Sequence, residues 1–474
     1  MLKKAVLVVT GNAAGFLLSL IRNLIVARLV SPENYGIASS FAVSMSIVEM
    51  LSYLGLNQLM VVDKDGDDPH FQAAMQGFQV MRGCFSSTAL YLIARPYAAY
   101  LHVEQVTWAY QMLAFVPFIN GLQHYDPHRL RRHLNFTPMI LSNAVPPFIS
   151  VLVLWPLALI YQDYRIMLVS IFVQAASMVV VSHVTAERRY RLALDFGLMK
   201  RATQFGWPIL LNGMLMFGVF NGERLIVGRE LGMDKFAYFS MAFTLTLTPT
   251  LVLASSCQSL FLPQLTRMKD RAADFQRMAD VTMESSLVIG LALVLGTSLL
   301  GGPLVHLLTG PKYISILSFL VPMAVMQAVR VAKTGSALIA LAVGKSGNAV
   351  VGNSVRVASL PISWWVAVRT GDILAIIWVA TVAEVLGYVL AMVLAARRAK
   401  VSLAALNLPT ALATLTCGLA LADALWTPPQ PGLGAHLHWG LLAVALAGVA
   451  SFATMTGLRH YLLVWWQARR QARG

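Results

Sequence analysis

The chain has 474 residues, of which 57% are hydrophobic and only 12% are charged, and its mean hydropathy is +0.67. Soluble domains carry about 25% charged residues, so this composition excludes a soluble globular protein and indicates a polytopic membrane protein. The formal net charge of +15 would suggest a nucleic-acid partner only on a soluble basic domain, and no segment is polar enough to form one.

The apolar segments have the length of membrane spans. A helix needs about 20 apolar residues to cross a hydrocarbon core of about 30 Å. This template predicts fourteen spans, near residues 5–30, 36–61, 71–94, 105–125, 136–160, 164–185, 205–228, 236–262, 282–308, 314–343, 346–368, 373–396, 408–426 and 437–463. The predicted fold class is therefore all-α, with about fourteen transmembrane helices and no loop long enough for a catalytic domain.

Basic residues in the connecting segments predict the orientation. If the N-terminus is cytoplasmic, the outer loops hold six basic residues: Arg95, Arg165, Arg229, Lys235, Lys312 and Arg369. The inner segments hold 22: Lys3, Lys4, Lys64, Arg129, Arg131, Arg132, Arg188, Arg189, Arg191, Lys200, Arg201, Arg267, Lys269, Arg271, Arg277, Lys345, Arg397, Arg398, Lys400, Arg469, Arg470 and Arg473. Short basic loops remain on the cytoplasmic side, so both termini are predicted to be cytoplasmic.

An internal repeat predicts two lobes. Leu24-Ile25-Val26-Ala27-Arg28-Leu29 recurs as Leu225-Ile226-Val227-Gly228-Arg229-Glu230, at an offset of 201 residues. Because six spans separate the copies, they share an orientation, which is typical of a parallel repeat. We expect a six-helix lobe at 1–186, a cytoplasmic linker at 187–204, a second six-helix lobe at 205–397, and two additional helices with a basic tail at 398–474. The linker is either an interfacial helix or a basic topology signal.

Basic side chains inside the spans are the main clue to function. A cation at mid-bilayer costs about 2.5–3.5 kcal/mol on the insertion scale, so such residues usually face a cavity or a partner. The six are Arg22, Arg82, Arg224, Arg330, Lys333 and Arg356. Arg28, near the outer end of the first span, either joins them or extends to the headgroups. The excess of cations predicts a central cationic cavity that handles an anion.

Fewer acids lie in the same spans. They are Glu49, Glu223, Glu284 and Glu384, and each is either a structural counter-ion or an ion-coupling group. Intramembrane amides either bind a polar substrate or join helices to one another. These amides are Asn12, Asn120, Gln123, Gln174, Asn212, Asn221 and Gln327.

Signals for catalysis and for cofactors are weak. The three cysteines, Cys84, Cys257 and Cys417, lack metal-ligand spacing and are predicted to pack as small apolar residues. The acidic segment 63–68 lacks the glutamate of a calcium loop and is predicted to be a solvated turn. We find no nucleotide loop and no nucleophile–base pattern, so we expect no enzyme activity, no cofactor, no metal and no nucleic-acid partner.

Several motifs resemble a known family. Arg22-Asn23-Leu24-Ile25-Val26-Ala27-Arg28 followed by Ser31-Pro32-Glu33-Asn34-Tyr35-Gly36 resembles the first helix and turn of polysaccharide-lipid flippases, including the O-antigen type, in the multidrug/oligosaccharidyl-lipid/polysaccharide exporter superfamily. Gly222-Glu223-Arg224-Leu225-Ile226-Val227-Gly228 resembles that family's seventh helix, and Leu262-Pro263-Gln264-Leu265-Thr266 resembles its loop after helix eight. Arg22 and Arg28 match two arginines of lipid II flippases, whereas Asn23 stands where those proteins usually have an acid.

The resemblance implies a transport function. Such a protein flips a polyprenyl-pyrophosphate-linked oligosaccharide to the outer leaflet of a bacterial inner membrane by alternating access, for O-antigen, exopolysaccharide or capsule. Guanidinium groups bind phosphate oxygens in a bidentate manner. Its partners would be membrane lipids and other polysaccharide assembly proteins, and we expect a monomer. The alternatives are a multidrug or metabolite antiporter of the same fold and, disfavoured by the short loops, a membrane-embedded polymerase or glycosyltransferase.

Overall fold

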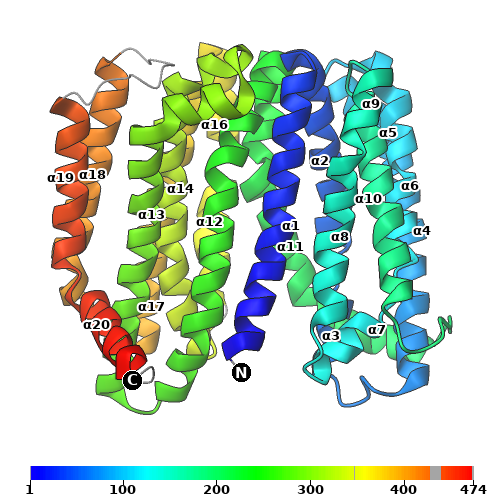
Figure 1. The fold of residues 1–474 in the computed structure, drawn as a ribbon, viewed down its shortest axis with the longest axis horizontal. Helices are drawn as coiled ribbons and strands as arrows, with labels where there is room; N and C mark the ends of the chain where they lie inside the picture. The colour runs from blue at the N-terminus through cyan, green and yellow to red at the C-terminus, as the bar shows by residue number, and fades with distance from the viewer. Residues whose placement is uncertain (1, 346, 428–438, 472–474) are drawn as a thin grey trace. The chain divides into compact units, whose positions relative to one another are not determined.

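A computed structural model describes residues 2–345, 347–427 and 439–471 of the chain. All regular structure in these ranges is helical (Figure 1), which confirms the all-α prediction. The side chain of Asn12 and those of Lys3, Lys4, Arg469, Arg470 and Arg473 lie outside the described part.

The chain divides into two compact units, Met1–Ser240 and Met241–Gly474. The helices of the first unit are α1 (Leu2–Leu29), α2 (Pro32–Ser52), α3 (Leu56–Val62), α4 (Pro69–Tyr100), η1 (Glu104–Val106), α5 (Thr107–Leu113), α6 (Phe115–Gly121), α7 (Asp126–Arg132), α8 (Thr137–Leu152), α9 (Leu154–Ile160), α10 (Arg165–Val184) and α11 (Phe196–Leu231). α12 (Met233–Met268) begins in the first unit and continues into the second. This division places α11 in the first unit, whereas the repeat predicts that the second lobe begins at residue 205, within α11. The lobe boundary based on the repeat stays a prediction.

The second unit contains the remaining helices. They are α13 (Ala272–Thr309), η2 (Pro311–Ile316), α14 (Leu317–Ala342), α15 (Gly347–Ala358), α16 (Leu360–Thr370), α17 (Ile373–Ala399), η3 (Ala404–Leu406), α18 (Asn407–Trp426), α19 (Trp439–Thr454) and α20 (Thr456–Gln471). Within this unit α14 packs against both α13 and α17, and α15 packs against α17. α14 is therefore a central helix of its unit.

Every predicted span overlaps at least one helix, but several spans are broken. In the described ranges, nine helices are long and apolar enough to cross a membrane, or ten if the pair α19–α20, bent by 70°, is one span. The predicted span 36–61 is interrupted at Gly55, whose φ of 63° lies in the left-handed region that suits glycine. The predicted span 346–368 is interrupted at Ser359, where a proline in the first turn starts α16. The count of fourteen crossings stays a prediction.

The predicted linker, residues 187–204, is helical only in its second part. Residues 186–195 form no helix, and α11 begins at Phe196, where the side chain of Asp195 caps the N–H of Leu198 at 3.0 Å. The interfacial-helix alternative is therefore wrong for residues 186–195, because this segment contains no helix, and the position of the linker at the membrane surface stays a prediction.

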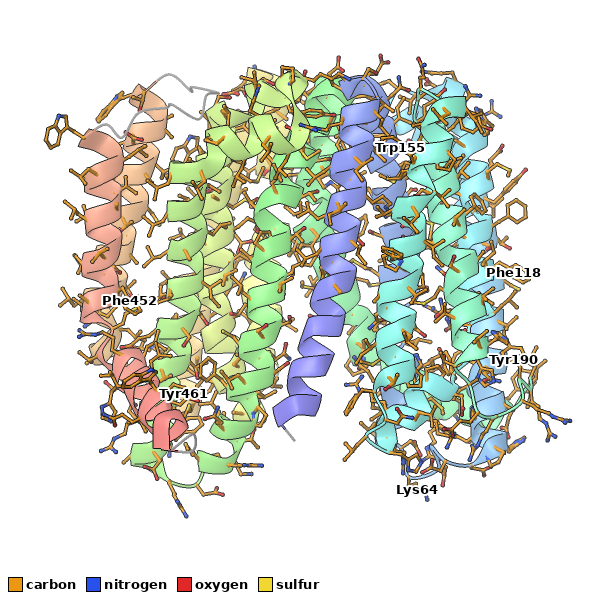
Figure 2. The ribbon with its side chains drawn as sticks, in the orientation of Figure 1. Lys64, Phe118, Trp155, Tyr190, Phe452 and Tyr461 are labelled. Atoms are coloured by element: carbon orange, nitrogen blue, oxygen red, sulfur yellow. The ribbon has the colours of Figure 1, made fainter. Side chains whose placement is uncertain are left out.

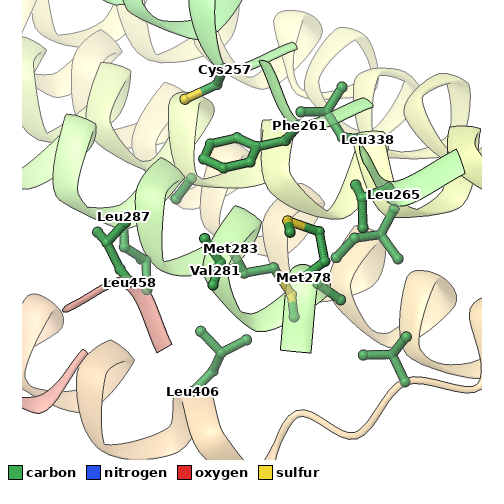
Figure 3. Close-up of a cluster of buried hydrophobic side chains, with 14 of the residues drawn as sticks. Cys257, Phe261, Leu265, Met278, Val281, Met283, Leu287, Leu338, Leu406 and Leu458 are labelled. Carbon is green, nitrogen blue, oxygen red and sulfur yellow. The ribbon is translucent and has the colours of Figure 1, made fainter. Parts of the chain in front are cut away.

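Apolar packing holds the second unit together. Figure 3 shows Cys257 and Phe261 of α12 among side chains of α13, and Leu406 and Leu458 join the same cluster. Lipid tails are as apolar as leucine, so such contacts stabilise a membrane bundle through close packing more than through removal of surface from water. Cys257 is buried there as a packing residue, Cys417 is partly buried in a neighbouring cluster, and Cys84 is exposed.

Candidate substrate-binding site

Three of the predicted cations contact one carboxylate in the second unit. Arg330 and Lys333 lie three residues apart on α14, Arg356 lies on α15, and Glu384 lies on α17. Arg330 Nε donates to Glu384 Oε1 at 2.8 Å, and Lys333 Nζ donates to Glu384 Oε2 at 2.9 Å. Arg356 Nε lies 3.3 Å from Glu384 Oε1. The acid that the sequence offered as either counter-ion or coupling group is thus the shared partner of three cations.

Further contacts hold this cationic cluster, defined as Arg330, Lys333, Arg356 and Glu384. Arg330 Nη1 donates to Gln327 Oε1 at 2.9 Å, one turn earlier on α14. Arg356 Nη1 donates to Ser359 Oγ at 3.3 Å, at the break between α15 and α16. These bonds fix the direction of each guanidinium before any ligand arrives, which reduces the ordering cost of binding.

The four charged side chains of the cluster are almost fully buried. The side chain of Glu384 is 0% exposed, that of Arg356 is 1% exposed, and those of Arg330 and Lys333 are each 10% exposed. Formally the cluster carries three positive charges and one negative charge, a sum of +2. Buried charge is costly unless it is compensated, which accounts for the contacts of all three cations with one carboxylate.

Two glycines let the helices of the cluster approach. A Cβ atom on Gly387 of α17 would lie 2.8 Å from the carbonyl oxygen of Gly352 on α15. Small residues at such a crossing allow two backbones to come close inside a membrane. The close crossing brings Arg356 within reach of Glu384.

The first unit contains a separate polar cavity. It has a volume of about 260 Å³ and lies among α2, α3, α4, α6 and α7, and the predicted residues that line it are Glu49, Arg82, Asn120 and Gln123. Arg82 Nε donates to Gln79 Oε1 at 3.1 Å, and Arg82 Nη1 donates to Ser52 Oγ at 3.2 Å. α3 and α7 lie at one end of the first unit, toward the labelled Lys64 and away from Trp155 (Figure 2). We call the cavity the inner-end cavity, because the basic residues predict that this end faces the cytoplasm.

The other predicted cations of the first unit lie apart from this cavity. Arg22 of α1 donates to the side-chain oxygen of Gln174 on α10. Arg28 is exposed, and Asn23 donates to the carbonyl oxygen of Ser19 in its own helix at 2.8 Å. Since neither Arg22 nor Arg28 lines the inner-end cavity, the two arginines shared with lipid II flippases stay predicted, untested binding residues.

Arg224 is anchored at the junction of α11 and α12. It donates to Ser240 Oγ at 3.2 Å and to the side chain of Asn221 at 3.4 Å, and its guanidinium lies 5.6 Å from the ring centroid of Phe236. The neighbouring Glu223 is 3% exposed. These contacts of Arg224 come from two neutral polar side chains and an aromatic ring.

Glu284 has a structural role in the second unit. Its Oε2 atom accepts from the backbone N–H of Leu458 at 2.6 Å, in the first turn of α20. A carboxylate is favourable at a helix N-terminus, where backbone N–H groups lack partners. Glu284 therefore caps the helix that follows the bend after α19.

The predicted inner segments of the first unit meet in an ionic network. Arg129 Nε donates to Asp126 Oδ1 at 2.6 Å, and the backbone N–H of Glu187 donates to Asp126 Oδ2 at 2.7 Å. Asp63, 9% exposed, pairs with Arg201 at 2.5 Å. The prediction of a solvated turn at 63–68 is therefore wrong for Asp63, because α11 supplies a basic partner.

Sequence reasoning missed several polar residues of the first unit. Gln72, Gln76 and Gln79 recur at i, i+4 and i+7 on α4, a spacing that places them on one face. Gln76 donates to the carbonyl oxygen of Arg191 at 2.6 Å, and Gln79 accepts from Tyr125 Oη at 2.9 Å. The glutamine spacing was the available signal for this polar face.

Comparisons with known proteins agree with the helical fold. A lipid II flippase, MurJ, in an inward closed conformation superposes with a TM-score of 0.70 at 10% identity, covering 98% of this chain and 100% of that one. An inward-facing multidrug resistance MATE family transporter of the MOP superfamily gives a TM-score of 0.67 at 13% identity, covering 81% of this chain and 94% of that one. At such identities the likeness concerns the fold.

Sequence relatives come from polysaccharide biosynthesis. The chain is 21% identical to the succinoglycan biosynthesis transport protein ExoT of Rhizobium meliloti (strain 1021), over 56% of this chain and 53% of that protein. It is 19% identical to the teichuronic acid biosynthesis protein TuaB of Bacillus subtilis (strain 168), over 73% of this chain and 72% of that protein. The chain thus spans about half of the first relative's length.

A family model covers most of the chain. The family described as "Polysaccharide biosynthesis protein" matches residues 25–318, which is more than half of the sequence. The match includes two of the motifs in which the sequence resembles the flippases, at 222–228 and 262–266. The apolar helices indicate a multi-pass membrane protein, and the family match shows that the chain belongs to the family described as polysaccharide biosynthesis protein.

Proposed function

We propose that this protein flips a polyprenyl-pyrophosphate-linked oligosaccharide from the inner to the outer leaflet of a bacterial inner membrane by alternating access, with both termini in the cytoplasm. The transported lipid would serve synthesis of an O-antigen, an exopolysaccharide or a capsule. Its polar head is the part that the bilayer rejects, so a flippase must provide charged and polar partners for it. No covalent step is required of the protein.

The observation that carries this proposal is the cationic cluster. Its formal charge of +2 (three cations and Glu384) equals in magnitude the charge of a pyrophosphate diester. Arg330 and Arg356 can each offer a planar pair of N–H donors to phosphate oxygens. A transporter of cationic drugs would instead need an excess of acids, so the cluster favours an anionic lipid over the antiporter alternative.

The test measures flipping by the purified protein in proteoliposomes. A polyprenyl-pyrophosphate oligosaccharide is placed in one leaflet, and its arrival in the other is followed by an impermeant sugar-oxidising reagent. We expect wild type to flip the lipid, and the double variant Arg330→Gln, Lys333→Gln to flip it at least tenfold more slowly. The matched control is Arg369→Gln, which removes an exposed cation stacked on Trp365 in the same unit.

A second readout separates binding from folding. Inorganic pyrophosphate should raise the unfolding temperature of wild type and of Arg369→Gln, because a ligand of the folded state stabilises it. The double variant should show no such rise. Equal flipping by the double variant and the control would overturn the role of the cluster, and export of a cationic dye without any flipping would support the antiporter.

A further inference from the structure

The inner-end cavity combines polar groups that differ in kind from the cationic cluster. Amides of Asn57, Asn120 and Gln123 line it together with the phenol of Tyr53. Tyr53 Oη donates to Asn57 Oδ1 at 2.9 Å, and Gln123 Nε2 donates to Asn120 Oδ1 at 3.3 Å. Asn57 Oδ1 also accepts from the backbone N–H of Gln58 at 3.0 Å, so Asn57 offers a ligand its amide donors, whereas Asn120 and Gln123 offer both donors and acceptors.

The formal charges in the cavity cancel. Arg82 and Glu49 both line it, one positive and one negative. His128 of α7 also lines it, and burial, aided by the neighbouring Arg131, lowers the pKa of this imidazole to about 4. His128 is therefore uncharged at neutral pH, and the cavity lacks the excess positive charge of the cationic cluster.

The size of the cavity limits the ligand. Its volume of about 260 Å³ lies just below the range of about 300–1,000 Å³ that is common for small-molecule sites. A single sugar ring fits this space, whereas a polyprenyl tail or a chain of several sugars does not. The tyrosine rings of Tyr53 and Tyr125 at the wall provide flat apolar faces of the kind that pack against a sugar ring.

The cavity also lies at a specific end of the first unit. α3 and α7, which help to form it, are next to the predicted inner segments that carry Lys64, Arg129 and Arg201. The basic-residue pattern predicts this end to be cytoplasmic. A lipid-linked sugar made in the cytoplasm would therefore meet this cavity before it crosses the membrane.

We infer that the inner-end cavity binds one uncharged sugar ring of the transported lipid, and so checks the head group on the cytoplasmic side. This inference rests on the proposed function and names the substrate class that this site accepts. Amides and phenols recognise hydroxyl groups through paired donors and acceptors, and a site that is built for such bonds rejects a ligand that lacks them. An acidic sugar would find no excess cation here.

The test uses free sugars and the full-length protein in detergent. Galactose, glucose and N-acetylglucosamine are the uncharged probes, and glucuronate is the acidic probe. Binding is measured by saturation-transfer NMR. We expect saturable binding of at least one uncharged sugar, and at least fivefold weaker binding of glucuronate than of glucose, from which it differs by its carboxylate.

Variants assign the binding to the cavity. Asn57→Ala and Gln123→Leu should each weaken binding of the uncharged sugar at least fivefold. Thr88→Ala is the matched control on α4, because Thr88 is exposed and bonds only to the carbonyl oxygen of Cys84 among the described contacts, at 3.0 Å. The unfolding temperature of each variant shows whether the fold is intact, and Asn57→Gln serves if Asn57→Ala is unstable.

The outcomes separate this inference from the proposed function. Unchanged sugar binding in both Gln123→Leu and the folded Asn57 variant, or tighter binding of glucuronate than of glucose, would overturn the cavity as an uncharged-sugar site even if wild type flips the lipid. Cavity-dependent sugar binding without lipid flipping by wild type would overturn the proposed function instead.

Discussion

Glu384 shows how one residue determines the electrostatics of a buried site. Its two carboxylate oxygens contact Arg330, Lys333 and Arg356 at 2.8–3.3 Å, and its side chain is 0% exposed. Three cations that would otherwise repel one another are held together by this single acid. The formal sum of these four charges, +2, is the basis of the proposed anion site.

Removing this acid should be costly. Glu384→Gln leaves three buried cations without their carboxylate, and breaking such a pair costs about 3–5 kcal/mol. We expect a large loss of folded protein, measured by size-exclusion yield and unfolding temperature. Adding Arg356→Met should restore part of the loss. Asp274→Asn is the control, since Asp274 and Arg271 form an exposed pair 4.0 Å apart, which contributes little. Equal unfolding temperatures for Glu384→Gln and this control would contradict the assignment.

We expect the stability of the folded protein to depend on pH through Asp126, at the predicted inner end of the first unit. Burial acts to raise the pKa of Asp126, but hydrogen bonds from Arg129 and from the N–H groups of Glu187 and Arg188 lower it below the ordinary value of 3.8. Because folding lowers the pKa of Asp126, its ionised carboxylate stabilises the folded protein above pH 3.8. This stabilisation is lost as the pH falls through the folded-state pKa.

The corresponding variant is Asp126→Asn. It should destabilise the protein at pH 7 by about 3 kcal/mol, the lower end for a buried pair, because Glu187 still contacts Arg129 at 3.0 Å. The difference in unfolding free energy from wild type should persist down to pH 3.8 and shrink below it. The exposed Glu104, changed to Gln, provides the comparison. A difference that stayed constant below pH 3.8 would argue against this role of the carboxylate.

At the scale of elements, the contact of α15 with α17 depends on two glycines. A Cβ on Gly387 would lie 2.8 Å from the carbonyl oxygen of Gly352, closer than real Cβ contacts. Overpacking of this kind costs about 1–3 kcal/mol. Since Arg356 and Glu384 lie on these two helices, the crossing also sets the geometry of the cationic cluster.

Gly387→Ala should therefore lower the unfolding temperature and slow lipid flipping, even though alanine is the better helix former. Gly418→Ala on α18 is the matched control, because no atom lies within 4 Å of the added Cβ. The control should be neutral or slightly stabilising. If Gly387→Ala behaved like Gly418→Ala in both measurements, close helix approach would not control the cluster.

At the scale of the whole molecule, the orientation in the membrane can be tested by labelling. In a variant with Cys84, Cys257 and Cys417 changed to Ser, single cysteines placed at Lys312 and Arg369 should react with an impermeant maleimide added outside intact cells. Cysteines placed at Arg129 and Arg271 should react only after the cells are opened. Labelling of the Arg271 position from outside would refute the predicted orientation.

The driving force is also a property of the whole molecule. A membrane potential contributes about 2.3 kcal/mol per charge per 100 mV, so a doubly charged head group moving outward gains roughly 4.6 kcal/mol at 100 mV, inside negative. We expect that collapsing the potential reduces net outward flipping in proteoliposomes without any proton or sodium gradient. Flipping that followed an imposed proton gradient and ignored the potential would instead favour acids such as Glu49 and Glu223 as proton carriers.

The class of the protein follows from its composition and from the length of its apolar segments. Long apolar segments with few charges leave a polytopic helical membrane protein as the physical solution, since a lipid-exposed backbone must satisfy its hydrogen bonds internally. Each cation inside a span could also be identified from the sequence, because a charge in an apolar segment is costly and therefore rare. The spacing of Arg330 and Lys333 already placed both on one face of a helix.

Which of these groups contact one another depends on how the helices pack. Nothing in the spacing of Glu384 indicates that it receives cations from both α14 and α15, because that contact depends on the close crossing at Gly352 and Gly387. Likewise, the break at Gly55 turns one predicted span into two helices that help to enclose the inner-end cavity. Periodicity along a chain reports the face on which a side chain lies, whereas the identity of its partner depends on how distant helices pack.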